Sequence, residues 1–536
     1  MQPRVEARRA TQPRERRALR RPAGPRPPTR PCATSCKTGP HPNGVRYAMH
    51  IPRQLPMICR ALVVVVLASQ ATGAQASRGA LQPGVVAFEG VNVVPMTSDT
   101  IITDVTVIVR DGRIASISPR RDARVPANAT RVDGRGKYLS PGFADMHVHL
   151  FADELLPESV SETELGVMLA NGVTAARLMI GTKNQLRLRR EIEAGRVLGP
   201  QLWVASPQLA GRPFPNGYTI TDTAQARSAV RDAVASGYDF VKLTLFITPP
   251  LYDAIVDEAR QRGIRAVGHV EPQVGVARAL AAGQPIEHLD GYLEAVLDDT
   301  VSAGRGLTQQ GIFRPQNWTT LDAVDEEKIA RLGGMTARAG GWGAWTSPTL
   351  NVFNDAFAVG PPEAVLRARP EWDVMPKRWR SDYLGHRSRY WSEEAAQWRT
   401  KARRERYVAL RNSLVKAIVD SGGHILAGSD TPEWFHLYGW GLHRELRALV
   451  TAGLTPYQAL QGATSNAATF LGADDQWGTI APGRRGDLVL LGGNPLADIG
   501  ATERIEGVMI GGRWLPPARL REMIDEAKRR LHGDGT

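Results

Sequence analysis

The sequence predicts an α/β protein in which a (β/α)8 barrel is joined to a small β-sandwich domain formed by both flanks of the barrel. Two observations support this. Short apolar segments alternate with amphipathic segments through residues 141–479, which is typical of βαβ units around a parallel sheet. Strand-like segments separated by turn residues occupy residues 77–140 and 480–516, on either side of that region.

The flanking segments show the alternation of apolar and polar residues expected of exposed sheets. Asp111 and Gly112 stand between two such runs and predict a hairpin turn, because this dipeptide readily adopts positive φ. A similar strand-like pattern occurs at residues 486–495 and 506–515, so the two flanks are expected to meet in one composite β domain. Residues 517–536 follow as a C-terminal helix or tail.

The middle region offers enough strands for a complete TIM-like barrel, whose active site lies at the carboxyl ends of its strands. Helices are expected between the strands, for example over residues 223–237 and 251–263. An insertion at residues 351–400 interrupts the pattern before the last strand. The eight candidate strands are 143–150, 173–180, 201–207, 239–246, 264–270, 285–290, 343–350 and 424–431.

The formal net charge of +13 is concentrated near the amino terminus. Residues 1–76 contain 14 of the 67 Lys and Arg residues but only 2 of the 54 acidic ones, which leaves a net charge of +1 on the rest. A nearly neutral body does not support nucleic-acid binding. We therefore expect no nucleic-acid partner.

The first 76 residues read as two segments. Residues 1–48 are rich in Arg and Pro and are expected to be disordered, as an extension upstream of a true start at Met49 or Met57. Residues 49–76 combine a basic stretch, a short apolar run and an Ala-x-Ala site, which predicts a signal peptide. We expect an exported protein, periplasmic or secreted, with no permanent membrane anchor.

Cysteine usage narrows the chemistry. Cys32, Cys36 and Cys59 all precede the expected cleavage site, so the mature chain would have no thiol. This excludes a cysteine protease and a thiolate metal site.

Chemistry-bearing residues gather at the ends of the predicted strands. His147 and His149 are two positions apart on one strand, so both imidazoles point to the same face and can reach one ion. His269 and His288 end two later strands, and Asp430 ends the last. Each has a structural alternative, since a single histidine can be a core residue and Asp430 can cap a helix.

Lys242 lies within an otherwise apolar strand. A buried lysine is costly unless it is paired, modified or neutral. Its alternative is a position at the barrel rim, where the long side chain keeps its ammonium group in water.

These motifs together resemble the amidohydrolase superfamily over most of residues 80–516. The segment Pro141-Gly-Phe-Ala-Asp-Met-His-Val-His resembles the metal motif of the first strand, and Ala427-Gly-Ser-Asp-Thr-Pro resembles the segment around the strand-eight aspartate. Val241-Lys-Leu, Gly268-His-Val and Ile286-Glu-His are similar to the family's ligand positions on strands four to six. The set is most similar to the binuclear, prolidase-like subgroup, which is related to the imidazolonepropionase-like members.

The resemblance implies a metal centre and a mechanism. His147, His149 and Asp430 would hold one divalent ion, His269 and His288 the other, and carboxylated Lys242, a CO2 adduct, would bridge them. Imidazole and carboxylate ligands suit zinc. Asp430 would act as general base and then acid during hydrolysis of an amide or peptide-like C–N bond. By this resemblance we expect a prolidase-like dipeptidase or an N-acyl amino acid amidase that acts on a small-molecule or dipeptide-like substrate, and we expect a homo-oligomer.

Two rival functions stay open. A mononuclear cyclic-amide hydrolase or deaminase, similar to imidazolonepropionase, is favoured by Glu271, because such members often place a proton-shuttling glutamate near this strand. Such an enzyme would not need Lys242. The second rival is a non-enzymatic scaffold on the same fold.

The insertion at 351–400 is dense in Trp and Arg, so it is either a helical segment packed on the barrel or a lid that selects the substrate. The lid interpretation makes several residues candidates for substrate binding. They are Arg378, Arg380, Arg387 and Arg389, together with His436 beyond the last strand.

Overall fold

A computed structural model describes residues 84–150, 158–214, 217–299, 301, 306–307 and 311–532. The disordered extension, the signal peptide and its cleavage site, all predicted within residues 1–76, lie outside the described residues. Contacts group Ser77–Thr536 as one compact unit. The described residues form an α/β fold, as the sequence predicts, while the division of this unit into a β domain and a barrel domain stays a prediction.

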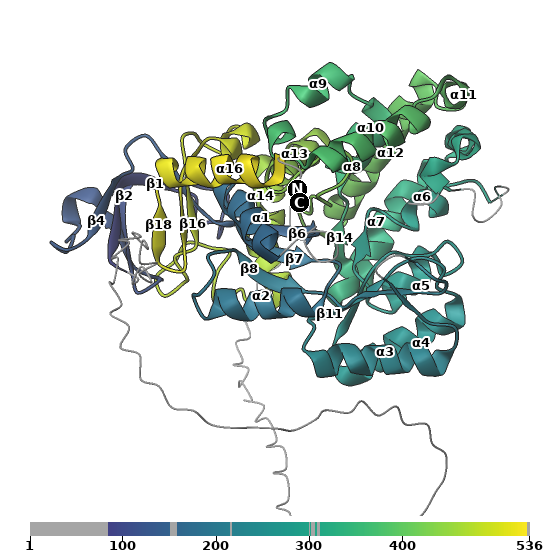
Figure 1. Cartoon of the computed structure of the whole chain (residues 1–536), viewed down its shortest axis with the longest axis horizontal. Coiled ribbons are helices and arrows are strands. Elements are labelled where there is room, and N and C mark those ends of the chain that lie inside the picture. Colours follow the sequence, from purple (N-terminus) through teal and green to yellow (C-terminus); the bar gives the residue numbers. More distant parts are fainter. Residues whose placement is uncertain are drawn as a thin grey trace, which may run out of the picture. The chain divides into compact units, whose positions relative to one another are not determined.

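Strands from the two flanks of the chain form one mixed sheet in the order β18-β17-β16-β5-β1-β2-β3, with β4 paired to β1. Figure 1 shows the purple amino-terminal strands beside the yellow carboxyl-terminal ones. Both flanks therefore contribute to a single sheet, and a second packed layer, which a sandwich requires, stays a prediction. The strands are β1 Val86–Val93, β2 Ile102–Arg110, β3 Arg113–Pro119, β4 Thr130–Asp133, β5 Tyr138–Pro141, β16 Leu488–Leu491, β17 Ile505–Ile510 and β18 Arg513–Leu515.

The hairpin predicted at Asp111-Gly112 joins β2 to β3, which pair antiparallel. Asp111 has φ of 51° and Gly112 has φ of 76°. Two central residues with positive φ give the turn a twist that matches the right-handed twist of the strands. The hairpin prediction is confirmed.

The parallel strands form three sheets, in the orders β6-β7-β8, β10-β9-β11-β12 and β13-β14-β15. Each of the eight segments predicted as strands contains one of them, whereas the short β9 and β10 were not predicted. The strands are β6 Phe143–Val148, β7 Val173–Leu178, β8 Gln201–Val204, β9 Gln208–Ala210, β10 Gly217–Thr219, β11 Phe240–Leu243, β12 Arg265–Gly268, β13 Ile286–Glu287, β14 Trp345–Ser347 and β15 His424–Ile425.

Bridges connect these sheets at two seams. Val148, at the end of β6, pairs with Thr431 beyond β15, and Ala205, just after β8, pairs with Phe240 in β11. The amide of Met146 also donates to the carbonyl of Ala427 at 2.9 Å. Because the strands joined by these bridges run parallel, the carboxyl ends of β6, β11 and β15 lie on the same side of the parallel sheets. Closure of the sheets into a complete eight-stranded barrel stays a prediction.

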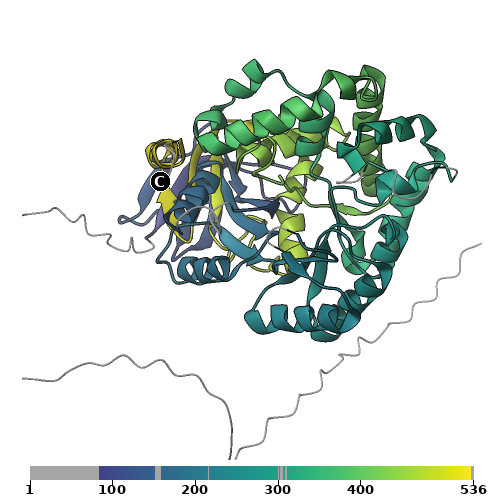
Figure 2. The ribbon, with the colours of Figure 1, turned by 45° about the vertical axis from the view of Figure 1, so that its right-hand side comes forward.

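Helices lie between most of the parallel strands along the chain, although among the described residues none lies between β8, β9 and β10, and Figure 2 shows helical segments outside the strands. The carboxyl-terminal α16 packs against α1. Within the described residues, no helix combines the length and apolar character that a membrane span needs. The helices are α1 Glu158–Ala170, α2 Lys183–Glu193, α3 Thr223–Ser236, α4 Pro249–Arg262, α5 Gly275–Ala281, α6 Tyr292–Ala295, α7 Glu327–Ala339, α8 Leu350–Asn354, α9 Glu363–Arg367, α10 Lys377–Tyr390, α11 Glu393–Ala396, α12 Lys401–Asp420, α13 Trp440–Thr451, α14 Pro456–Gly462, α15 Ser465–Leu471 and α16 Pro517–His532.

The insertion at 351–400 is helical and carries a small apolar core of its own. Leu366, Trp372 and Met375 are buried together with Phe435, which comes from the segment after β15. The rings of Trp372 and Phe435 stack with centroids 5.9 Å apart. The insertion is thus anchored by packing to the segment that follows Asp430.

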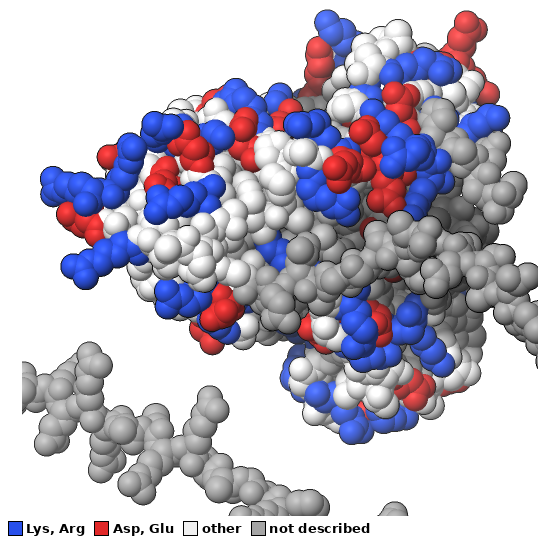
Figure 3. Space-filling model, turned by 60° about the vertical axis from the view of Figure 1, so that its left-hand side comes forward, with Lys and Arg blue, Asp and Glu red and all other residues white. Residues whose placement is uncertain are grey.

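Surface charges of both signs are interspersed on the face that Figure 3 shows. Several charged residues form ion pairs over short distances, such as Arg131 with Glu89 at 2.8 Å and Lys137 with Glu506 at 3.3 Å. Exposed pairs of this kind each contribute little to stability, about 0–1 kcal/mol.

Gly142, between β5 and β6, is a point where the mixed sheet and the parallel strands approach closely. A Cβ at this position would lie 2.1 Å from Oγ1 of Thr174, a buried residue of β7. We expect Gly142→Ala to lower the free energy of unfolding by about 1–3 kcal/mol, because the stiff threonine cannot move aside. Chemical unfolding of the two proteins measures this difference.

Gly166→Ala in α1 is the matched control. Its Cβ would meet only Met523, at 3.8 Å, and alanine stabilises a helix interior by about 0.5–1 kcal/mol relative to glycine. Equal effects of the two substitutions would contradict the close approach at Gly142.

Candidate metal centre

One cavity of about 1040 Å³ lies at the carboxyl ends of the parallel strands. The structure brings all six ligand-type residues predicted from the sequence into its lining. His147 ends β6 together with Val148, Lys242 is in β11, and the others directly follow strands or lie in the segment after β15. The six are His147, His149, Lys242, His269, His288 and Asp430.

The four imidazoles form a continuous group. The ring centroids of His147 and His288 are 4.5 Å apart, those of His269 and His288 are 4.9 Å apart, and those of His147 and His149 are 5.3 Å apart. Burial is the first cause that lowers the pKa of all four rings. Neighbouring cationic groups add to this lowering, while Asp430 opposes it at His149 and His269. The rings are therefore neutral at neutral pH, the state in which imidazole binds a metal.

Asp430 lies at the centre of this group. Its Oδ1 is 3.2 Å from Nε2 of His149 and 3.4 Å from Nε2 of His147, while its Oδ2 is 3.5 Å from Nδ1 of His288. One ligand atom from each of His147, His149 and Asp430 can be chosen so that all lie within 4.8 Å of one another. This arrangement can hold a divalent ion.

Unsatisfied nitrogen atoms support that fit. Nε2 of His147 and Nδ1 of His149 are buried and have no hydrogen-bond partner among the described residues. A buried polar atom without a partner costs about 1–3 kcal/mol, and a bound metal ion would remove that cost at His147 by accepting the lone pair. The donor set of two imidazoles and one carboxylate suits zinc and other first-row divalent ions.

Glu287 positions His147 and was not predicted as a site residue. Its Oε2 accepts a hydrogen bond from Nδ1 of His147 at 2.8 Å, and its Oε1 accepts from Nη2 of Arg177 at 2.7 Å. All three side chains are fully buried. Because Nδ1 of His147 donates to this carboxylate, Nε2 keeps its lone pair directed to Asp430 and the cavity.

Two further side chains orient the second pair of histidines. Nδ1 of His269 lies 2.8 Å from Oδ2 of Asp290, and Nδ1 of His288 lies 2.8 Å from Oγ1 of Thr349. The Thr349 hydroxyl donates to the carbonyl of Pro348, so its oxygen accepts from His288. In both rings Nε2 is left as the nitrogen available to a metal.

Lys242 lies within the same cavity and is almost completely buried, with 1% of its surface exposed. Burial lowers its pKa to about 8, against the opposing influence of Glu287 and Asp430. Gly268 allows the lysine to pass, since a Cβ there would lie 2.9 Å from Cδ of Lys242 and 2.3 Å from the Leu243 carbonyl oxygen. The rim position considered as an alternative is wrong, because Lys242 is enclosed.

Backbone strain coincides with this site. His288 has φ of 59° and Asp430 has φ of 52°, in the left-handed region that side chains other than glycine rarely adopt. Such strained residues persist where the surrounding structure holds them, and they cluster at functional sites. The strain adds a structural signal that the sequence could not provide.

The other candidates lie elsewhere. His436 is fully buried with Nε2 3.0 Å from Oδ2 of Asp355, and it is not among the residues that line the cavity. Its expected role in substrate binding is not supported, because the ring faces the insertion. Glu271 accepts a hydrogen bond from the amide of Phe246 at 2.6 Å and is likewise not part of the lining.

The four arginines of the insertion divide into two pairs. Arg378 and Arg389 line a second cavity next to the first. Arg380 instead lies over the ring of Trp372, with its guanidinium carbon 5.4 Å from the centroid, and Arg387 donates to the carbonyl of Pro361 at 2.8 Å. The last two make structural contacts, so the substrate-binding prediction for them is not supported by their placement.

Comparison with known proteins identifies the family of this chain. The amidohydrolase family model matches residues 138–332 and 405–515, more than half of the chain. The chain belongs to the amidohydrolase family. The matched ranges include all six ligand-type residues and leave out the insertion.

Among solved structures, this amidohydrolase is similar to a candidate prolidase from Bifidobacterium longum. The two share 25% identity and a TM-score of 0.58 over 83% of this chain and 99% of that chain. A bottromycin amidohydrolase matches with 24% identity and a TM-score of 0.64 over 84% of this chain and 92% of that chain. The second likeness shows the fold alone.

Curated relatives include deaminases. An adenine deaminase of Deinococcus radiodurans is 30% identical over 27% of this chain and 26% of its own length. Adenine deaminase 3 of Rhizobium meliloti is 24% identical over 78% of this chain and 55% of its own length. The chain thus spans about a quarter of the first relative and about half of the second. These names describe the relatives and leave the reaction of this amidohydrolase to be proposed.

The positioning role of Asp290 gives a direct prediction. Asp290→Asn should weaken metal affinity by about 10- to 100-fold, because the amide no longer accepts from Nδ1 of His269 as strongly or fixes its tautomer. Competition with a fluorescent chelator measures the affinity without reference to activity. Asp253→Asn is the matched control, since Asp253 on α4 pairs with exposed Arg278 of α5. Unchanged metal affinity in Asp290→Asn would contradict the role of Asp290.

Proposed function

We propose that this chain is an exported, binuclear metal-dependent hydrolase of amide or peptide-like bonds, a prolidase-like dipeptidase or an N-acyl amino acid amidase. The observation that carries the proposal is the gathering of four neutral imidazoles, Asp430 and Lys242 in the lining of one cavity. Family membership supports the hydrolase class, and the likeness to a candidate prolidase supports the choice of substrate bond.

In the proposed centre, His147, His149 and Asp430 would hold one ion, and His269 and His288 would hold the other. Lys242, if carboxylated, would be a ligand shared by both. The lowered pKa of Lys242 favours this modification, because a neutral amine adds to CO2 and loses a proton to give a carbamate anion. The modification would replace a buried cation by an anion, which two divalent ions would neutralise.

When bound, divalent ions supply hydroxide at neutral pH and polarise the scissile carbonyl. Asp430 lies among the imidazoles and accepts the proton of the attacking water, then returns it to the leaving amine. Glu287, Asp290 and Thr349 keep the rings oriented throughout, so little reorganisation accompanies the reaction. No serine or cysteine nucleophile is required.

The mononuclear deaminase is the alternative, and the names of the curated relatives favour it. Two observations weigh against it. The first is that Glu271 accepts a hydrogen bond from the Phe246 amide and is not part of the cavity lining. The second is that buried Lys242 has no role in a one-metal site. Release of ammonia from adenine, with no cleavage of N-acyl amino acids or dipeptides, would favour the deaminase.

The proposal includes the expectations that lie beyond the site itself. The parallel strands close into a (β/α)8 barrel, with the metal centre at their carboxyl ends and the β domain at its side. The mature chain begins near Ser77 after export and assembles into a homo-oligomer. Its substrate is a small molecule or a dipeptide, in keeping with a cavity of about 1040 Å³.

Substitutions of Lys242 test the bridge. Lys242→Ala should lose one or both metals and most activity, and short carboxylates should restore part of the bridge. Lys242→Arg should also fail, because a guanidinium stays cationic and cannot form a carbamate. Metal analysis and kcat of both variants are the measurements.

A structural role for the lysine makes the opposite forecast. Arginine would then preserve a positive charge and a long side chain, and the variant would keep its metals. Two metals per chain with undiminished kcat in Lys242→Arg would show that the bridge does not exist.

A further inference from the structure

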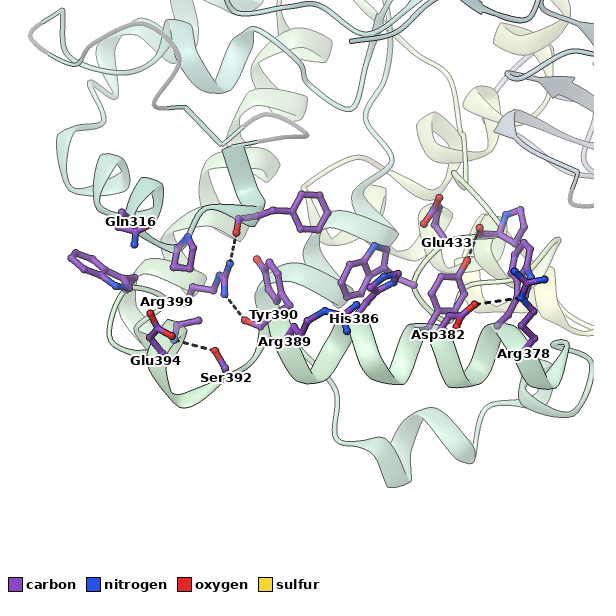
Figure 4. A pocket seen from close by; sticks show the side chains of 18 residues that line it. Gln316, Arg378, Asp382, His386, Arg389, Tyr390, Ser392, Glu394, Arg399 and Glu433 are labelled. Atoms are coloured by element: carbon purple, nitrogen blue, oxygen red, sulfur yellow. Dashed lines mark hydrogen bonds and ion pairs between the residues drawn. The ribbon is translucent and has the colours of Figure 1, made fainter. Parts of the chain in front are cut away.

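A second cavity of about 890 Å³ adjoins the metal cavity. Figure 4 shows its lining side chains, many of them along α10. The two cavities share the same boundary residues, which come from the 311–313 turn, from α10 and from the segment after Asp430. These are Phe313, Trp379, Pro432, Glu433 and Trp434.

One face of α10 forms a wall of this cavity. Arg378, Asp382, His386 and Arg389 recur every three or four residues and all line it, as does Tyr390. This spacing puts them on the same side of a helix. The residues of α10 and α11 lie outside the ranges that the family model matches, so the model does not describe this wall.

The lining is rich in aromatic rings. Trp434 stacks near Phe313 with centroids 6.0 Å apart, and Tyr390 lies edge-on to Phe313 at 6.1 Å. Trp379, Tyr383 and Trp398 complete the aromatic lining. Tyr383 is held in place by donating to the carbonyl of Pro432 at 3.0 Å. A cavity of this kind suits a planar apolar group.

A buried cation lies at one end of the cavity. Arg399 is 4% exposed and donates to the carbonyls of Tyr390, Ile312 and Phe313, yet it has no carboxylate partner among the described residues. Its Nε is buried without a hydrogen-bond partner. Its guanidinium carbon lies 3.6 Å from the ring centroid of Tyr390. A buried cation bound only to neutral groups is stabilised further by an anion.

Arg389 adds a second positive charge to the lining. It is exposed, and in the described part of the chain no acid pairs with it, whereas Arg378 lies 3.9 Å from Asp382. The remaining acids of the lining are Glu394, which is exposed, and Glu433 at the boundary with the metal cavity. Among the described residues, Arg389 and Arg399 are therefore the two arginines of the lining that have no acidic partner and could recognise an acidic group, and Figure 4 shows Glu394 on the side of Arg399.

We propose that this second cavity binds an aromatic group bearing a carboxylate, with the ring among Trp434, Tyr390 and Phe313 and the carboxylate near Arg389 and Arg399. As a statement about substrate, it rests on the proposed function: the scissile amide would lie in the metal cavity and the aromatic acid would extend past Trp434. As a statement about binding, it stands on the second cavity alone.

Calorimetric titration with 2-naphthoate and with its neutral amide, 2-naphthamide, tests the proposal on the full, metal-loaded protein. We expect the acid to bind about tenfold more tightly than the amide, the size of one partly exposed charge-assisted contact. Arg389→Gln should weaken acid binding by about tenfold and leave amide binding unchanged. Arg399→Lys should weaken acid binding too, with the melting temperature reporting on its fold.

Arg380→Gln is the matched control. It removes the same charge from the same helix, but Arg380 lies over Trp372 and lines neither cavity. Equal affinity for acid and amide, or equal loss in the Arg389 and Arg380 variants, would overturn the proposal. So would loss of acid binding after chelation of the metals, since the probe would then occupy the metal cavity. An absence of amide hydrolysis would contradict the proposed function and leave the binding result intact.

Discussion

The site depends on the two buried hydrogen bonds that the carboxylate of Glu287 accepts. Glu287 belongs to β13, accepts from His147 in β6 and from Arg177 in β7, and thereby ties together strands of two different sheets. Arg177 in turn donates to the carbonyl of Met146, next to His147. Removing one partner of a buried pair costs about 3–5 kcal/mol, so stability and metal-ligand geometry rest on the same contact.

The six ligand-type residues could be predicted because strand ends converge in a parallel α/β fold. The period of two at His147 and His149, and the placement of His269 and His288 after successive apolar runs, carry that information in the sequence. Their partners could not be predicted. Glu287 and His147 are 140 residues apart, and nothing local indicates that one accepts from the other. The strain at Asp430 is equally invisible before the backbone is known.

The insertion at 351–400 is a second place where the sequence could not predict the role of individual residues. Its density of Trp and Arg predicts either packing or recognition, and the structure contains both. Trp372 is buried against Phe435, while Trp379 lines both cavities. The rotation of α10 about its own axis decides which of its side chains face the second cavity. It places Arg389 in the lining and leaves Arg387 to donate to a backbone carbonyl. Composition alone cannot predict that rotation, and the family model does not cover this segment.

The most direct test of the account is the number of metal ions per chain. Elemental analysis of the zinc-loaded wild-type protein after gel filtration, referred to protein concentration from amino-acid analysis, gives this number. The binuclear centre predicts two zinc ions per chain, with retention of both at neutral pH. A single ion per chain, bound as tightly as a structural site, would contradict the bridging lysine and favour the mononuclear alternative.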